Sequence, residues 1–124
     1  MTVAQTLELS GWLRMDTYGE ADDILYLSDE PTEPLIERLQ EEISEHQISV
    51  RYWICDQEET KSSAIEAFLH VLDGVADVKF GSRYSEATGY LWTDEELMVG
   101  GHDLVQELSS ATGKFLILEV DIHQ

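Results

Sequence analysis

The segment Gly100–Asp103 contains the residues best suited to chemistry. Two glycines before a helix can direct backbone N–H groups at an anion, and an adjacent histidine is suited to acid–base work. The segment lacks the Gly-x-Gly pattern and the lysine of a phosphate-binding loop. We favour a glycine turn in which Asp103 caps a helix. The alternative is an anion- or nucleotide-binding site formed by Gly100, Gly101, His102 and Asp103.

Other nucleophiles and metal ligands lack the spacing that catalysis or metal binding requires. The four histidines show no His-x-x-x-His pattern and Cys55 is the only cysteine, so no structural zinc site is expected. No Gly-x-Ser-x-Gly motif marks a serine nucleophile, and Cys55 would need an adjacent base to act as one. We therefore predict a protein that is not an enzyme and that holds no metal and no cofactor.

The strongest feature is an excess of acidic residues, with 26 Asp and Glu against 7 Lys and Arg and a net charge of −19. Glu33, Glu37, Glu41 and Glu45 are each four residues apart, so on one helix they would form a row of carboxylates. Like charges at this spacing cost roughly 0.2–0.5 kcal/mol per pair, and only Arg38 offsets them. The predicted partner-binding carboxylates are those of Glu33, Glu37, Glu41, Glu42, Glu45, Asp22, Asp23, Asp29 and Glu30.

This charge pattern has three interpretations. A row of carboxylates on a rigid helix can imitate a nucleic-acid backbone and occupy the basic groove of a nucleic-acid-binding protein. Alternatively, the row only solvates a helix face, as in salt-adapted cells, or it binds a cation, although Asp22-Asp23 and Asp29-Glu30 lack EF-hand spacing. The net charge opposes direct binding to nucleic acid and to anionic membranes, because both are negatively charged.

Trp12 and Trp53 are predicted to project from the more polar sides of their strands. Exposed tryptophans are favoured anchors of protein interfaces. These two residues therefore join the predicted partner-binding set, and they make a homodimer one option. The alternative is that a helix covers this second face of the sheet.

The elements that position these residues follow from hydrophobic periodicity. Alternation predicts strands over residues 6–15, 24–27, 48–55, 75–84, 89–92 and 114–122. Helical spacing predicts helices over 34–45, 63–74 and from His102 or Asp103 to Gly113, with a short helical turn over 94–99. The predicted fold is α+β, a single domain over residues 1–124 in the order β-β-α-β, α, β-β-α-β, with helices packed on a mixed or antiparallel sheet.

The expected compartment is the cytoplasm. No apolar run is long enough to cross a bilayer, and the N-terminal residues lack a signal-peptide pattern. One cysteine cannot form an internal disulfide, which is typical of proteins in a reducing compartment.

The stretch Tyr90–Leu104 reads YLWTDEELMVGGHDL and is followed by Glu107-Leu108 and Gly113-Lys114. It resembles small uncharacterised acidic proteins of phages and prophages over roughly the last third of the chain. The resemblance implies no catalytic residue. It implies a setting in the host cytoplasm, since small acidic phage proteins often bind and disable host machinery, as anti-restriction and anti-CRISPR inhibitors do.

These features favour a non-enzymatic acidic inhibitor or nucleic-acid mimic that binds a basic, nucleic-acid-handling host protein. Two alternatives stay open. One is a small anion- or nucleotide-binding module around Gly100–Asp103, and the other is an oligomeric phage accessory protein that uses Trp12 and Trp53.

Overall fold

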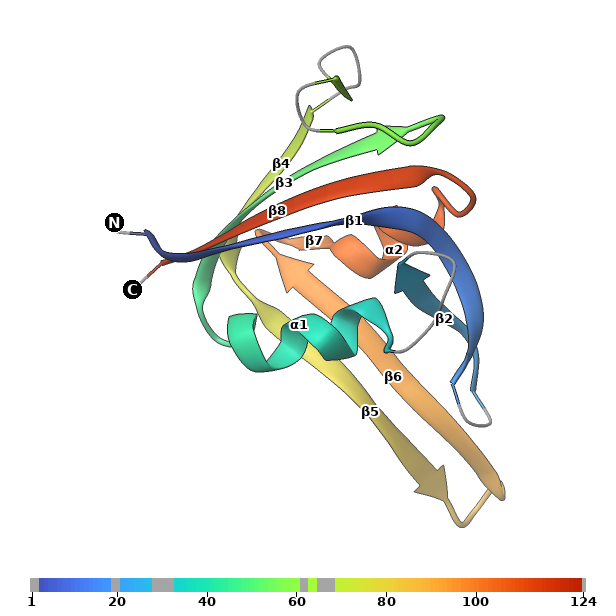
Figure 1. Ribbon diagram of the computed structural model, residues 1–124. Coiled ribbons are helices and arrows are strands. Elements are labelled where there is room, and N and C mark those ends of the chain that lie inside the picture. Colours follow the sequence, from blue (N-terminus) through green and yellow to red (C-terminus); the bar gives the residue numbers. More distant parts are fainter. Residues whose placement is uncertain (1–2, 19–20, 28–32, 61–62, 65–68, 124) are drawn as a thin grey trace.

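The computed structural model describes residues 3–18, 21–27, 33–60, 63–64 and 69–123 (Figure 1). Most of this chain is strand. The strands are β1 (Val3–Tyr18), β2 (Ala21–Leu27), β3 (Gln47–Cys55), β4 (Leu69–Val75), β5 (Asp77–Ser85), β6 (Tyr90–Val99), β7 (His102–Asp103) and β8 (Phe115–His123). The helices of the described residues are α1 (Leu35–Ile43) and α2 (Leu104–Ser109).

The strands form two antiparallel sheets. The larger has the order β2-β1-β8-β3-β4, and the smaller has the order β5-β6-β7. β1 serves two partners, because residues 3–12 pair with β8 and residues 13–18 pair with β2. Both helices and the smaller sheet lie on the same side of the larger sheet (Figure 1). We call this side of the larger sheet its inner face and the opposite side its outer face.

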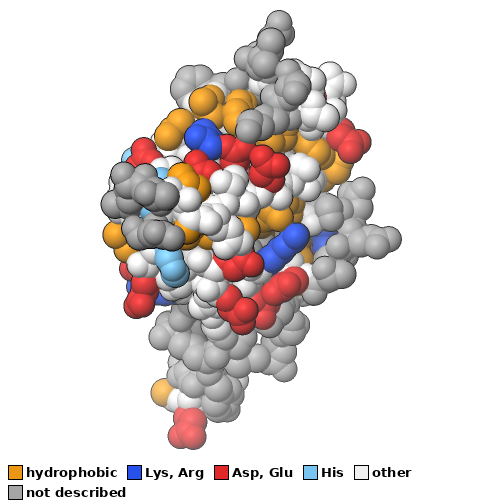
Figure 2. Space-filling view, turned by 60° about the vertical axis from the view of Figure 1, so that its left-hand side comes forward, with side chains coloured by type: hydrophobic (Ala, Val, Ile, Leu, Met, Phe, Trp, Pro, Cys, Tyr) orange, Lys and Arg blue, Asp and Glu red, His pale blue; other side chains and the backbone are white. Residues whose placement is uncertain are grey.

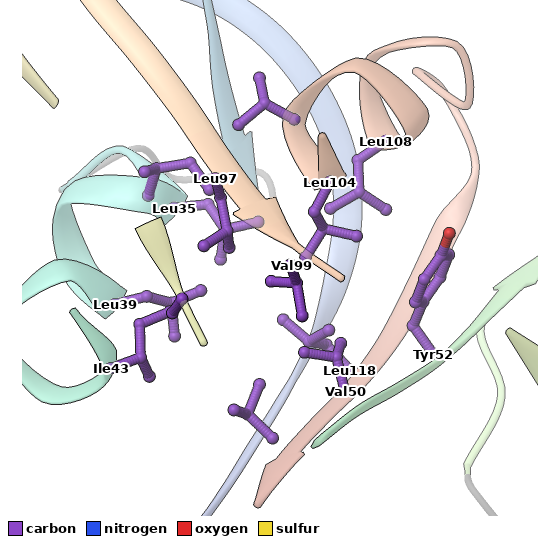
Figure 3. Packing of buried hydrophobic residues seen from close by; sticks show 14 of the residues in the cluster. Leu35, Leu39, Ile43, Val50, Tyr52, Leu97, Val99, Leu104, Leu108 and Leu118 are labelled. Carbon is purple, nitrogen blue, oxygen red and sulfur yellow. The ribbon is translucent and has the colours of Figure 1, made fainter. Parts of the chain in front are cut away.

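The hydrophobic core lies between the inner face and the layer formed by α1, α2 and β6 (Figure 3). Alternate residues of β3 and β8 enter it, since successive side chains of a strand point to opposite faces. Val50 is 0% exposed and Leu118 is 1% exposed. The largest cluster of buried residues includes both sheets and both helices, so the described residues pack as a single domain.

The alternation of apolar residues located most strands correctly. The predicted strands over 6–15, 24–27, 48–55, 75–84 and 114–122 correspond to β1, β2, β3, β5 and β8, and the predicted strand over 89–92 is the beginning of β6. The helix expected over 34–45 is α1, which is slightly shorter. The α+β class is therefore confirmed, and of the two predicted arrangements, mixed or antiparallel, the described strands show the antiparallel one.

The helix predicted over residues 63–74 is wrong where the structure describes it. Residues 69–75 form β4, which pairs with β3 in the register Tyr52↔His70. The interval between Leu69 and Leu72 fits a helix, but pairing places these residues on opposite faces of the sheet. Tertiary pairing therefore overrides the local pattern. Residues 65–68, which carried the rest of this prediction, lie outside the described residues.

The short helical turn predicted over residues 94–99 is also wrong. These residues belong to β6, in which residues 94–98 pair with β5 and Val99 pairs with β7. The predicted order β-β-α-β, α, β-β-α-β is therefore incorrect, because β4, β5 and β6 follow one another without a described helix between them. The third predicted helix is confirmed as α2, and the Asp103 side chain accepts a hydrogen bond from the Val105 N–H as its cap.

Candidate functional site

The acidic segment around α1 is exposed, although it is not one continuous helical row. α1 ends at Ile43, and Glu45 has a φ of 66°, so its backbone has left the helix. Glu33 precedes the helix, which leaves Glu37 and Glu41 as the members of the row within it. The expectation that one helix carries the whole row is therefore wrong.

The side of α1 that packs on the core is entirely apolar. Leu35, Ile36, Leu39 and Ile43 are at most 2% exposed, which directs the other side of the helix to solvent. On that side the carboxylates of Glu41 and Glu42 are exposed and that of Glu37 is half-buried, while the last turn has no basic residue. Glu33 and Glu45 are exposed at the two ends of the helix. The α1 carboxylates, defined as Glu33, Glu37, Glu41, Glu42 and Glu45, therefore present negative charge with Arg38 as the basic residue among them.

The other predicted acidic residues are not described in the same detail. Asp22 and Asp23 lie in β2, but their side chains are outside the described part of the structure. Asp29 and Glu30 lie outside the described residues altogether. Their place in a binding surface remains a prediction.

A second group of charges lies on the outer face of the larger sheet. Register places Glu8, Glu119 and Arg51 side by side on β1, β8 and β3. Glu119 is 4% exposed and accepts a hydrogen bond from the Arg51 guanidinium, which also donates to Asp121 at 3.0 Å. The bond to Glu119 raises the pKa of Arg51, and the nearby charge of Asp121 adds to this effect. The strands therefore hold a partly buried charged network on the face of the sheet that lies away from the core.

Next to this network, a cavity of about 810 Å³ opens on the outer face. Phe115 and Ile117 of β8 provide apolar contacts, and residues 58–60 and Ser63 form another part of the lining. A cavity of this size is within the usual range for ligand sites, about 300–1,000 Å³. We call it the outer cavity. Its lining includes four carboxylates, those of Glu8, Glu58, Glu59 and Glu119.

The two predicted interface tryptophans lie at one end of this face and are half-buried. Trp12 packs edge-on against Phe115, with ring centroids 5.3 Å apart. Both tryptophans join a small apolar cluster with Phe115, Ile117, Ala64 and Cys55. Burial raises the pKa of the Cys55 thiol to about 11, and Glu59 adds to the rise, so Cys55 is poorly suited to act as a nucleophile at neutral pH. The tryptophans thus lie on one face of the sheet and are half-buried beside Ala64, and their role as interface anchors stays a prediction.

A smaller cavity of about 200 Å³ lies between β1 and α1. Leu7, Leu9 and Leu39 provide its apolar lining, and Arg38 and Glu42 are also part of it. Glu8 lines both this inner cavity and the outer cavity. The inner cavity therefore lies between Glu42, one of the α1 carboxylates, and the N-terminal half of β1.

The segment Gly100–Asp103 forms a turn in which the side chains of His102 and Asp103 have partners. Gly100 and Gly101 have φ values of 56° and 83°, which glycine adopts without strain. Gly100 also lies against β4, since a Cβ there would come within 2.3 Å of the Asp73 carbonyl oxygen. Asp103 caps α2, and the His102 Nδ1 lies 3.4 Å from a Glu107 carboxylate oxygen. This favours the glycine-turn interpretation.

Tyr52 in the core also contacts Glu107, the partner of His102. Its hydroxyl donates to Glu107 at 2.6 Å, and its ring stacks on His70 with centroids 4.6 Å apart. Burial raises the pKa of Tyr52, and the bond to Glu107 raises it further. The hydroxyl therefore stays protonated and positions Glu107, which is a structural role.

Sequence reasoning missed the outer cavity. Glu8 and Glu119 could have been assigned to the polar faces of their strands by alternation, but the register that places them together is not readable from the sequence. Among the described residues, no group of three or more His, Cys, Asp or Glu side chains is placed to hold a metal. No described helix is both long enough and apolar enough to cross a membrane.

Comparison with known proteins found no matching family model, no matching curated protein and no matching solved structure.

Proposed function

We propose that this protein is a non-enzymatic acidic inhibitor that occupies the basic groove of a nucleic-acid-handling host protein in place of nucleic acid. The observation that carries the proposal is the cluster of α1 carboxylates, of which Glu33, Glu41, Glu42 and Glu45 are exposed. A rigid helix holds the middle of this cluster at fixed spacing. Such a surface steers a basic partner and competes with phosphates for its lysines and arginines.

The outer face supports the same proposal with a different kind of contact. Figure 2 shows Asp and Glu side chains directly beside hydrophobic side chains in the upper part of the view. Interfaces need apolar contact as well as charge, because charge pairs on a wet surface contribute little affinity. The resemblance of residues 90–104 to phage proteins gives the proposal a biological setting, with the inhibitor acting in the host cytoplasm.

The geometry gives less support to an anion- or nucleotide-binding module at Gly100–Asp103. The carboxylate of Asp103 occupies the N-terminus of α2, where an anion would otherwise bind. Glu107 adds a second negative charge next to His102. A phosphate placed there would meet two carboxylates, so we do not develop this alternative further.

The experiment is an inhibition assay with a restriction endonuclease and an RNA-guided nuclease, each cleaving its own DNA substrate. We expect inhibition of at least one nuclease, competitive with DNA and weaker at higher salt. The triple variant Glu41→Gln, Glu42→Gln, Glu45→Gln removes three exposed carboxylates. It should raise the inhibitory concentration by about tenfold or more and flatten its salt dependence, since each of these carboxylates would form a charge-assisted hydrogen bond with the basic groove.

A matched control removes the same number of charges from other exposed positions, by Asp73→Asn, Asp77→Asn and Glu86→Gln. This variant should inhibit almost as well as the wild type. Equal loss of inhibition in both triple variants would show that only net charge matters. Absence of inhibition by the wild-type protein, with neither nuclease bound in a direct assay, would contradict the proposal for these nucleases.

A further inference from the structure

One long edge of β1 has no described strand beside it. Residues 3–12 pair with β8 on one side, and β2 joins β1 only from residue 13 onward. Within the described chain no other strand pairs with residues 3–11, which we call the open edge. On such an edge, alternate backbone N–H and C=O groups point away from the sheet and can pair with another strand.

A cavity flanks the open edge on each face of the sheet. The inner cavity is lined by Leu7, Glu8 and Leu9 of this edge, and the outer cavity is lined by Glu8, Leu9 and Ser10. Leu7 and Leu9 are only partly buried, whereas Leu13, farther along the same face of β1, is 1% exposed. The inner side of the strand is therefore left accessible where the open edge runs and is closed where β2 begins.

We infer that the open edge of β1 binds an extended segment of a partner as an additional strand, with alternating apolar and basic side chains. Alternate side chains of an added strand point to opposite faces of the sheet. Apolar side chains would enter the inner cavity over Leu7, Leu9 and Leu39. Lysine or arginine side chains would lie beside Glu8 and extend toward the other carboxylates of the outer cavity.

Charge distinguishes this occupant from a second copy of the same chain. Two copies with a net charge of −19 each repel one another, and an added β1 strand would bring a second Glu8 to the same edge. The outer cavity beside this edge already carries the carboxylates of Glu8, Glu58, Glu59 and Glu119. An added strand with basic side chains is therefore favoured over an added acidic one. The inference rests on the proposed function for the basic character of the partner, and adds how the partner binds.

The experiment titrates the full chain with an acetylated, amidated peptide in which valine and lysine alternate, as long as the open edge. The comparison peptide has the same composition with its lysines in one block. We expect the alternating peptide to bind about tenfold more tightly, because it alone matches the two faces. Hydrogen exchange of the β1 amides should slow on binding, whereas exchange in β5 and β6 should not change.

Two N-methylated peptides test the backbone contact. Each carries methyl groups on every second residue, so each blocks one of the two edges of the peptide strand. One of them should lose binding and the other should retain it. Equal binding by both, or equal loss in both, would overturn strand addition.

Glu8→Lys tests the charge at the open edge, and Glu86→Lys is the matched control in the exposed turn between β5 and β6. Glu8→Lys should weaken binding of the alternating peptide by about tenfold or more, against a small effect of Glu86→Lys. Glu8→Gln, a milder change, should give an intermediate loss. If Glu8→Lys does not weaken peptide binding while the wild-type protein inhibits a nuclease, the inference fails and the proposed function survives. If the peptide binds at β1 but no nuclease is inhibited, the inference stands and the proposed function fails.

Discussion

On the inner face of the larger sheet, the central strands β3 and β8 present Val50, Tyr52, Leu118 and Val120 to the core. On the outer face, the same two strands present Arg51 with Glu119 and Asp121. The period-two alternation of each strand produces both faces, but different interactions stabilise them. Burial of apolar area stabilises the inner face, whereas paired charges and the small apolar cluster around the two tryptophans stabilise the outer face. Substitutions on the outer face should therefore alter binding with less effect on stability than substitutions on the inner face.

The largest expected effect is on the inner face. Leu118→Ala should lower the free energy of unfolding by about 2–5 kcal/mol, because it leaves a cavity in a close-packed core. Val71→Ala, on the outer face of β4 and 52% exposed, should change it by no more than about 0.5 kcal/mol. Urea denaturation followed by tryptophan fluorescence measures both. Similar losses in the two variants would show that the faces do not differ as described.

The next effect is in the charged network of the outer face. Arg51→Met removes the guanidinium from the buried carboxylate of Glu119, and should destabilise the fold by about 1–3 kcal/mol. Adding Glu119→Gln to Arg51→Met should recover part of this loss, since the double variant buries no charge at that position. Urea denaturation of the four proteins of this cycle gives the coupling. If the double variant is no better than the single, the network contributes packing and not charge pairing.

Glu95 brings a carboxylate into the interior between β6 and β2, and it predicts a pH dependence. Burial raises the pKa of Glu95 from 4.5 to about 7, while a hydrogen bond from the Leu25 N–H opposes the rise and the charge of Asp103 adds to it. The folded protein therefore binds this proton more tightly than the unfolded chain does. Stability from this group is present below pH 4.5 and is lost as pH increases toward 7.

Glu95→Gln should remove this loss. As pH rises from 4.5 to about 7, the free energy of unfolding of the wild type should fall by about 1–2 kcal/mol relative to that of the variant. This figure allows for partial exposure of the carboxylate. Urea denaturation at a series of pH values measures the difference, in which the titrations of other groups cancel. A constant difference across the series would show that Glu95 titrates normally in the folded protein.

The smallest effect is expected at the surface ion pair of Lys114 and Asp56. These side chains are 49% and 86% exposed, so water competes with the contact. Lys114→Ala should leave the urea midpoint unchanged within measurement error. A clear decrease in the midpoint would mean that exposed charges stabilise this acidic protein more than the comparison of its two faces implies.

The sequence predicts those elements whose spacing of apolar residues matches the side that is buried. Apolar residues alternate in β3 and β8 because one face of each strand is buried. They recur at helical spacing in α1 because one side of the helix is buried, so periodicity located all three elements. The sequence did not predict β4, because its apolar residues Leu69, Val71 and Val75 are exposed on the outer face. Its apolar residues do not mark the buried side, and only pairing with β3 fixes its conformation.

Of the candidate surfaces, one could be predicted from the sequence and two could not. The α1 carboxylates are close in sequence, so their clustering was predictable even though the helix ends before Glu45. The outer cavity combines β1, β8 and the segment after β3, and the open edge exists because β2 joins β1 only at residue 13. Both depend on which strands become neighbours, and no local pattern in the sequence specifies that.

The two ends of the described chain meet in the middle of the larger sheet, and this has a consequence for folding kinetics. Thr6 on β1 bonds to Asp121 on β8, at a sequence separation of 115 residues. Closing so long a loop costs entropy before the contacts can offset it, and proteins dominated by such pairings fold in milliseconds to seconds. During synthesis, β1 and β3 must wait for β8 to emerge, with their apolar inner faces exposed. We therefore expect these strands to fold only once β8 has been synthesised, with their strong negative charge opposing association until then.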